Sequence, residues 1–134
     1  MEYNFLLLED NKLFIQKNET FLQLNQENLD SLKADYSLIS TNEIKDNNPF
    51  DSKVIELLKD NKVVISFEKV SSALKVLEKN KIIDHLRREN FRKISLPIFV
   101  HSEYLKNYLK DSDLHFELGL FLENSNFQEI ELGS

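Results

Sequence analysis

Residues 69–96 read KVSSALKVLEKNKIIDHLRRENFRKISL, and the fold depends on whether this stretch forms helices or strands. It also contains the strongly basic segment of an acidic chain. Between Lys75 and Lys93 there are seven lysines and arginines against three acidic residues, whereas the rest of the chain has ten basic and twenty acidic residues. If the protein contacts a partner by charge, we expect the contact here or on the acidic flanks.

Residues 81–93 fit two structures. A helix would place four side chains on one stripe at i, i+4, i+7 and i+11, namely Lys81, His85, Arg88 and Arg92. A hairpin would make strands of IIDHLR and FRKISL with a turn at residues 88–90, and Pro97 would then stand at a strand end. The residues before them predict an amphipathic helix ending near Asn80, because apolar side chains recur at helical spacing at Val70, Ala73, Leu74 and Leu77.

In the hairpin interpretation, residues 51–96 resemble a winged helix-turn-helix. VSSALKVLEKNKII is similar to the recognition helix leading into the first wing strand, and RRENFRKISL is similar to the wing. The sequence departs from that family where KVVISF and a single helix replace two helices, and where Asn80-Lys81 replaces a glycine turn. The resemblance implies that Ser71, Ser72 and Lys75 face DNA bases. It also implies that Arg87, Arg88 and Arg92 face the phosphate backbone.

The amino-terminal part predicts a β-meander over residues 3–24. Three apolar segments are separated by polar joints at Glu9-Asp10-Asn11 and Asn18-Glu19, and Asn and Asp suit tight turns. Residues 26–35 predict a short helix and residues 36–40 a strand. The polar stretch 41–51 is the most loop-like part of the chain, and it is the alternative point of division if the chain is not one domain.

The remaining segments complete the predicted fold. Asp51 or Ser52 caps a helix that reaches about Asp60, residues 62–67 form a buried strand, and Ser102 caps a second amphipathic helix. DLHFELGLFLE and FQEIEL predict a carboxy-terminal hairpin with Leu114, Phe116, Leu118 and Leu120 in the core. We therefore expect a single α+β domain over residues 1–134, with a meander, three to four helices, the hairpin and one mixed sheet.

The composition excludes several classes of protein. With 41% apolar and 30% charged residues the chain is globular, and without cysteine it has no disulfide framework, thiolate metal site or thiol nucleophile. The amino end MEYNFLLLEDNK lacks the basic start and long apolar core of a secretory signal, and no stretch approaches the roughly 20 apolar residues of a membrane span. We expect a cytoplasmic protein that does not interact with membranes.

Candidate metal ligands lie in the predicted carboxy-terminal strand. Asp113, His115 and Glu117 alternate on one side of it, and His101-Ser102-Glu103 supplies a second His-x-Glu sequence, a set that suits a metal-dependent phosphoesterase. The simpler interpretation is the charged solvent face of an antiparallel sheet. We favour that one and predict no bound metal and no cofactor.

No catalytic motif is present, and two glycines cannot build a glycine-rich phosphate loop. The sequence therefore favours a non-enzymatic interaction protein, such as a subunit, adaptor, inhibitor or immunity-type protein, whose partner carries an acidic surface. The alternatives are a nucleic-acid-binding regulator and a small metal-dependent hydrolase. The predicted interaction residues are the basic patch of Lys81, His85, Arg87, Arg88, Arg92 and Lys93.

Overall fold

A computed structural model of the chain describes residues 2–42, 44, 49–69, 74–78, 81–86 and 92–131. The strands are β1 (Asn4–Glu9), β2 (Lys12–Lys17), β3 (Thr20–Gln23), β4 (Tyr36–Ser40), β5 (Val63–Lys69), β6 (Leu74–Glu78), β7 (Lys81–Leu86), β8 (Arg92–His101) and β9 (Phe127–Glu131). The helices are α1 (Ser52–Leu58), α2 (Ser102–Asp111) and α3 (Leu118–Glu123), with a short 3-10 turn at Leu29–Ser31. None of these helices is long and apolar enough to cross a membrane.

The predicted amino-terminal meander is present. β2 pairs antiparallel with both β1 and β3. Asp10 and Asn11 have φ angles of 52° and 61°, the backbone that a two-residue hairpin turn requires, and Asn18 has a φ of 57° in the next turn. The short helix predicted for residues 26–35 is reduced to the 3-10 turn at Leu29–Ser31.

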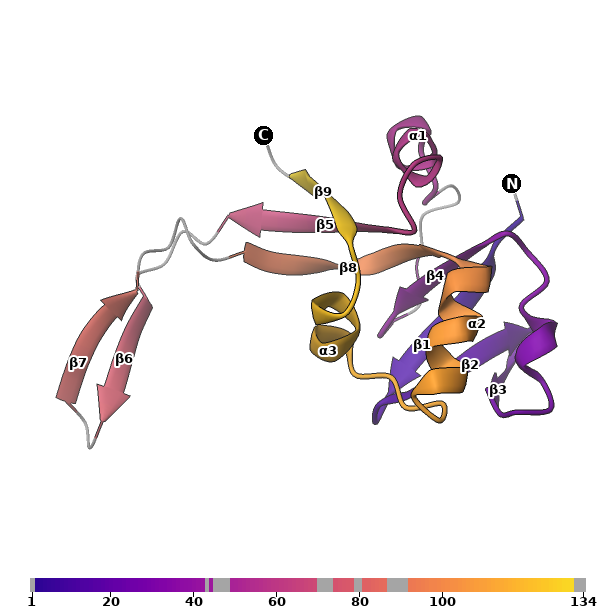
Figure 1. Cartoon of the computed structure of the whole chain (residues 1–134), viewed down its shortest axis with the longest axis horizontal. Coiled ribbons are helices and arrows are strands. Elements are labelled where there is room, and N and C mark those ends of the chain that lie inside the picture. The colour runs from indigo at the N-terminus through magenta and orange to yellow at the C-terminus, as the bar shows by residue number, and fades with distance from the viewer. Residues whose placement is uncertain are drawn as a thin grey trace.

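Seven strands form one mixed sheet in the order β3-β2-β1-β4-β8-β5-β9 (Figure 1). β1 is parallel to β4, and β5 is parallel to β9. β8 lies between β4 and β5 and is antiparallel to both. We call the edge where β1, β4 and β5 begin the amino edge of the sheet, and the edge where they end the carboxyl edge.

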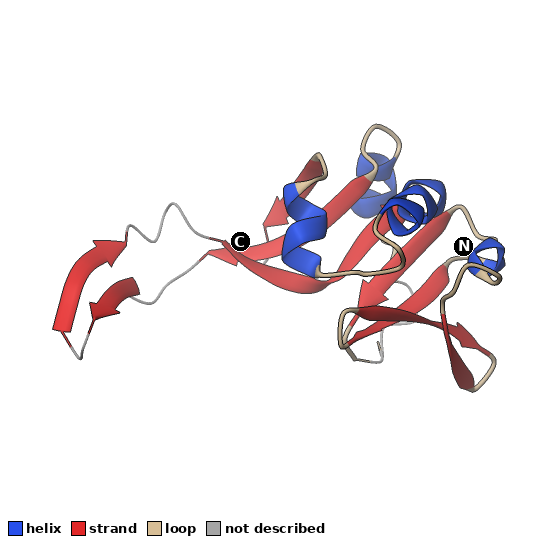
Figure 2. Ribbon diagram, turned by 60° about the horizontal axis from the view of Figure 1, so that its bottom comes forward, coloured by secondary structure: helices blue, strands red, loops and turns tan. Residues whose placement is uncertain are grey.

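The described part of residues 69–96 forms strands. β6 and β7 pair antiparallel in a separate two-stranded sheet, which Figures 1 and 2 show apart from the large sheet. The amphipathic helix predicted up to Asn80 is wrong, since β6 occupies part of it, and so is the recognition helix implied by the winged helix-turn-helix resemblance. The hairpin interpretation is right that strands form here. Its pairing is wrong, because β7 pairs with β6 while β8 pairs with β4 and β5.

The two faces of the large sheet carry separate hydrophobic clusters. α2 and α3 cover one face, where Leu105, Leu109 and Phe121 pack onto residues such as Leu6 and Ile98 (Figure 2). α1 covers part of the other face through a smaller cluster, whose fully or nearly buried members are Leu38, Phe50, Val54, Leu58, Val64, Phe99 and Ile130. The sheet therefore separates two hydrophobic cores, one on each face.

The predicted carboxy-terminal hairpin is wrong in its first strand. Asp113 and Leu114 have positive φ angles of 54° and 68°, which strands do not use. The Glu117 carboxylate then caps α3 by accepting hydrogen bonds from the backbone N–H groups of Gly119 (3.0 Å) and Leu120 (2.7 Å). The helix turns Phe121 into the core and leaves Leu120 45% exposed, the reverse of the prediction for these two residues. Phe116 is buried as predicted, and Leu114 and Leu118 pack against the core.

The predicted α+β class is therefore wrong, because it expected too much helix and too little sheet. The structure is mainly one mixed seven-stranded sheet, with three α-helices among the described residues. In β6, Leu74 and Leu77 fit helical spacing, whereas Leu74 and Val76 fit strand spacing, which explains the helix predicted there. The alternating leucines of α3 likewise fit both periods over so short a length, which explains the predicted strand. The division of the chain into domains stays a prediction.

Candidate anion-binding pocket

The two edges of the sheet differ in how the chain continues from each strand. β1 ends at the carboxyl edge in the tight Asp10-Asn11 turn, so that no helix begins there. β8 runs directly into α2, and because β8 is antiparallel, this helix begins at the amino edge, where Tyr36 pairs with His101. Helix N-termini present N–H groups that attract anions. The amino edge is therefore the place to look for a ligand.

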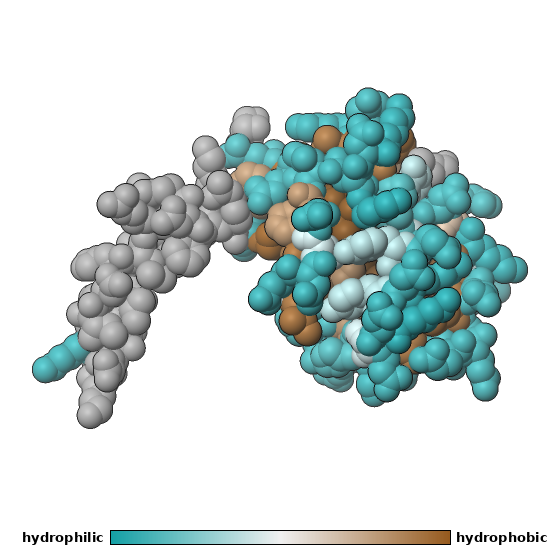
Figure 3. Space-filling view, in the orientation of Figure 1, coloured by the Kyte–Doolittle hydropathy of each residue, from teal (hydrophilic) through white to brown (hydrophobic). Residues whose placement is uncertain are grey.

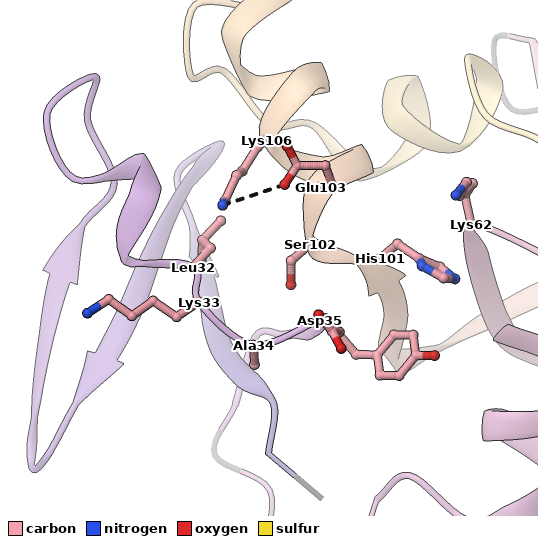
Figure 4. Close-up of a pocket in the computed structure, with 10 residues that line it drawn as sticks. Leu32, Lys33, Ala34, Asp35, Lys62, His101, Ser102, Glu103 and Lys106 are labelled. Carbon is pink, nitrogen blue, oxygen red and sulfur yellow. Dashed lines mark ion pairs between the residues drawn. The ribbon is translucent and has the colours of Figure 1, made fainter. Parts of the chain in front are cut away.

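A pocket of about 350 Å³ lies at this position (Figure 4). The loop before β4 contributes one wall, the start of β5 and the end of β8 contribute another, and the first turns of α2 lie above them. The lining residues are Leu32, Lys33, Ala34, Asp35, Tyr36, Lys62, His101, Ser102, Glu103 and Lys106. Figure 3 shows that the face of the molecule carrying α2 is largely hydrophilic, with apolar side chains between the helices.

Buried polar side chains fix the base of the pocket. The Ser102 hydroxyl lies 2.7 Å from the Ser37 hydroxyl, and the Asn4 amide donates to the hydroxyls of Ser37 and Ser102, both at 3.1 Å. The Ser102 backbone N–H donates to the Asp35 carbonyl at 2.8 Å. These bonds join the start of β1, the start of β4 and the start of α2, so the helix N-terminus is held in one position.

His101 occupies the position before α2 without capping it. Its side chain makes no capping hydrogen bond. Its Nε2 instead lies 2.5 Å from the Leu58 carbonyl oxygen at the end of α1, and its ring packs edge-on against Tyr36. A carbonyl oxygen only accepts, so Nε2 carries the hydrogen. The N–H groups of the first turn of α2 beyond Ser102 have no intrahelical partner and point along the helix axis toward its N-terminus.

The charges of the pocket centre on Lys106. Its side chain is only 15% exposed, whereas the Glu103 side chain beside it is 79% exposed, and the ammonium and the carboxylate lie 3.7 Å apart. Figure 4 shows the pair above the pocket. That separation is too long for a good hydrogen bond. Among the described residues Lys106 has no second acidic partner, although a lysine whose side chain is mostly covered is normally closely paired.

The arrangement suits an anion better than a nucleophilic reaction. Three lysines line the pocket against the two carboxylates of Asp35 and Glu103. The Ser102 side chain, whose hydroxyl lies at the start of α2, is 3% exposed and bonded to Ser37 and Asn4. The pocket can hold a negatively charged group between Lys62, Lys106 and the start of α2.

The residues predicted from sequence lie elsewhere. In the basic patch, Lys81 begins β7 and Lys93 lies in β8, both exposed, while His85 and Arg92 lie in β7 and β8. Arg87 and Arg88 lie outside the described residues. The patch is therefore not tested as an interaction site, and the acidic protein partner stays a prediction.

The candidate metal ligands are not arranged as predicted. Asp113 and His115 lie in a loop, and both Glu117 oxygens cap α3. Within the described ranges no group of three or more His, Cys, Asp or Glu side chains lies close enough together to hold a metal ion. His101 and Glu103, the second predicted pair, line the anion pocket instead.

Sequence reasoning missed Lys33, Asp35, Lys62 and Lys106. One signal was present, because a strand running directly into a helix at Ser102 brings a helix N-terminus to a sheet edge. Lys33, Asp35 and Lys62 come from loops distant in sequence, and no local pattern joins them.

No protein-family model and no curated protein matches this sequence. Solved structures do match. The 2-C-methyl-D-erythritol 4-phosphate cytidylyltransferase of Thermus thermophilus is similar with a TM-score of 0.60 and 15% identity, over 77% of this chain and 54% of that one. The 4-diphosphocytidyl-2C-methyl-D-erythritol synthase of Anaerococcus prevotii is similar with a TM-score of 0.52 and 17% identity, over 78% and 53%.

A third structure, the bifunctional IspDF from Campylobacter jejuni, is similar with a TM-score of 0.56 and 20% identity, over 81% of this chain and 28% of that one. The chain thus spans about half the length of the first two proteins and less of the third. At these identities the likeness shows the fold alone. The chain has a nucleotidyltransferase-like fold.

This fold corrects the functional prediction. The sequence favoured a non-enzymatic interaction module, with a nucleic-acid-binding regulator and a metal-dependent hydrolase as alternatives, and it predicted no enzyme. Two of the similar structures are named as enzymes, a cytidylyltransferase and a synthase, and the comparisons give none of these three interpretations any support. The error came from taking the lack of a short catalytic motif as the lack of a pocket.

Proposed function

We propose that this chain is an enzyme-type domain of nucleotidyltransferase-like fold that binds a phosphorylated small molecule in the pocket at the start of α2. The observation that carries the proposal is Lys106, whose side chain is only 15% exposed and whose ammonium has only a long contact, 3.7 Å, to the carboxylate of an exposed glutamate. A phosphate placed between Lys106, Lys62 and the first turn of α2 would complete its pairing.

The fold supports the enzymatic part of the proposal. Two of the similar proteins are named as a cytidylyltransferase and a 4-diphosphocytidyl-2C-methyl-D-erythritol synthase. The nucleotide that we test first is therefore cytidine triphosphate. Open α/β sheets usually hold phosphates on a glycine-rich turn after the first strand. Here Asp10 and Asn11 form a hairpin turn at that position. We therefore propose that the phosphate binds at the amino edge.

Calorimetric titration tests the proposal. Cytidine triphosphate and inorganic pyrophosphate are titrated into the protein and into a Lys62→Gln/Lys106→Gln double variant. We expect the unmodified protein to bind, and the double variant to lose at least about tenfold in affinity, because two charge-assisted contacts are removed. Turnover is followed by mass spectrometry of nucleotide-linked products after incubation with cytidine triphosphate and a metabolite extract.

The matched control is Lys12→Gln/Lys53→Gln, which removes the same charge at exposed lysines outside the pocket. It should bind like the unmodified protein. Equal losses in both double variants would mean that only net charge matters. No binding of either probe at millimolar concentration would contradict the proposed function.

A cytoplasmic location belongs to the same proposal. It is supported by the absence of cysteine, which fits a reducing compartment, and by the small, charged ligand that the pocket suits. Fractionation of the native cell with an antibody to this chain tests it.

A further inference from the structure

Two glutamate–lysine pairs at i,i+3 spacing differ in their surroundings. In α1, Glu56 and Lys59 are 72% and 60% exposed and lie 3.0 Å apart, as expected of a free surface pair. In α2, Glu103 and Lys106 lie 3.7 Å apart, and the lysine is mostly shielded while the glutamate is not. The mobile partner of the second pair is therefore the carboxylate. It lines the same pocket as the ammonium.

We infer that Glu103 is a built-in competitor: in the free protein its carboxylate takes the position on Lys106 that the anionic ligand requires, and the ligand displaces it. This inference rests on the proposed function. Glu103 lies in the first turn of α2, where a negative charge also interacts favourably with the helix N-terminus. One side chain thus offers an anion to both groups that would otherwise attract the ligand.

Displacement has a consequence for the charge of the ligand. When a ligand with one negative charge displaces Glu103, one anion replaces another, so the electrostatic energy of the pocket improves little. Asp35 adds a second negative charge at the pocket wall. A phosphate monoester or pyrophosphate carries more charge than the carboxylate that it displaces. Glu103 therefore makes the pocket selective for multiply charged anions over simple carboxylates.

The swing of Glu103 is sterically free. Its side chain is 79% exposed and its carboxylate makes no hydrogen bond to Lys106, so the ligand has to replace an electrostatic attraction and breaks no hydrogen bond. Lys106 stays in place because most of its side chain is covered. The ammonium is the fixed element and the carboxylate the movable one.

The experiment titrates inorganic pyrophosphate and acetate into the unmodified protein, Glu103→Gln and Glu56→Gln. Glu103→Gln keeps the shape and removes the competing charge, so pyrophosphate should bind about threefold to tenfold more tightly. Glu56→Gln changes the net charge equally in the matched pair of α1, and it should leave the affinity unchanged. Acetate should bind measurably only to Glu103→Gln.

The outcomes separate the two proposals. If the unmodified protein binds pyrophosphate and Glu103→Gln binds it equally or more weakly, the competitor role is wrong while the proposed function stands. Equal gains in Glu103→Gln and Glu56→Gln would also overturn the competitor role, because net charge alone would explain them. If neither the unmodified protein nor Glu103→Gln binds, both proposals are overturned.

Discussion

The amino and carboxyl edges of the sheet are closed in different ways. At the carboxyl edge the turn between β1 and β2 is covered by the chain after α2, and the Phe116 backbone N–H donates to the Asn11 carbonyl at 2.9 Å. At the amino edge, hydrogen-bonded polar side chains form the base of an open pocket. The contrast indicates that the pocket forms at the amino edge because β8 runs directly into α2 there.

The largest expected effect on stability comes from a substitution in the packing at the carboxyl edge. Phe116 is fully buried and packs against Phe121 and Tyr108, so Phe116→Ala should lower the free energy of unfolding by about 3–5 kcal/mol. Urea denaturation measures this loss. Pyrophosphate affinity of the folded fraction should not change, since the pocket lies at the other edge.

Phe127→Ala is the control for that substitution. Phe127 is 37% exposed at the start of the edge strand β9, so its truncation should cost clearly less. If Phe116→Ala cost less than about 0.5 kcal/mol, the carboxyl edge would not be closed by packing and the comparison of the edges would fail.

A smaller effect is expected at the amino edge. Ser102→Ala removes a buried hydroxyl that bonds with Ser37 and Asn4, and it should cost about 1–3 kcal/mol in unfolding free energy. Pyrophosphate binding should weaken as well, because the start of α2 is no longer fixed. Ser112→Ala, which removes an exposed hydroxyl at the other end of α2, is the matched variant. A loss of binding in both variants would show that Ser102 has no special role.

The smallest effect concerns the cap of α3. Glu117→Ala removes the acceptor of two backbone hydrogen bonds and should cost about 1 kcal/mol. Burial and, next, the Glu117 carboxylate raise the pKa of Tyr108 above its ordinary value, so this substitution should also lower that pKa. NMR titration of the Tyr108 ring measures the change. Glu123→Ala, on the same helix, should alter neither quantity, and an unchanged Tyr108 in Glu117→Ala would remove Glu117 from the explanation.

Local signals were enough for the elements at which only one structure fits the residues. Asp10, Asn11 and Asn18 are good turn residues, and the meander between them is as predicted. Asp51 caps α1 by accepting from the Val54 N–H, also as predicted. The prediction for the run from Leu114 to Leu122 failed because α2 ends in a turn with left-handed backbone at Asp113 and Leu114, closed by a hydrogen bond from the Leu114 N–H to the Leu109 carbonyl. The glycine that usually marks such a helix end is absent here.

The site was harder to predict than the fold. His101 and Glu103 were noticed, but as metal ligands, since their spacing suits that chemistry as well. Lys106 shares its pocket with Leu32 and Lys33, which lie about seventy residues earlier in the chain. Burial of a charge by a distant segment leaves no periodic pattern in the sequence.

The central position of β8 governs the order in which the protein can fold. The meander and β4 are complete by Ser40, yet one side of β4 stays unpaired until Ile98–His101 are made and pair with Tyr36–Ile39. β5 and β9 join the rest only through β8 as well. During synthesis nearly sixty more residues must therefore be added before the exposed backbone hydrogen-bonding groups of β4 can be paired. Such long-range closure makes folding slow and places the risk of aggregation on the nascent, half-made sheet.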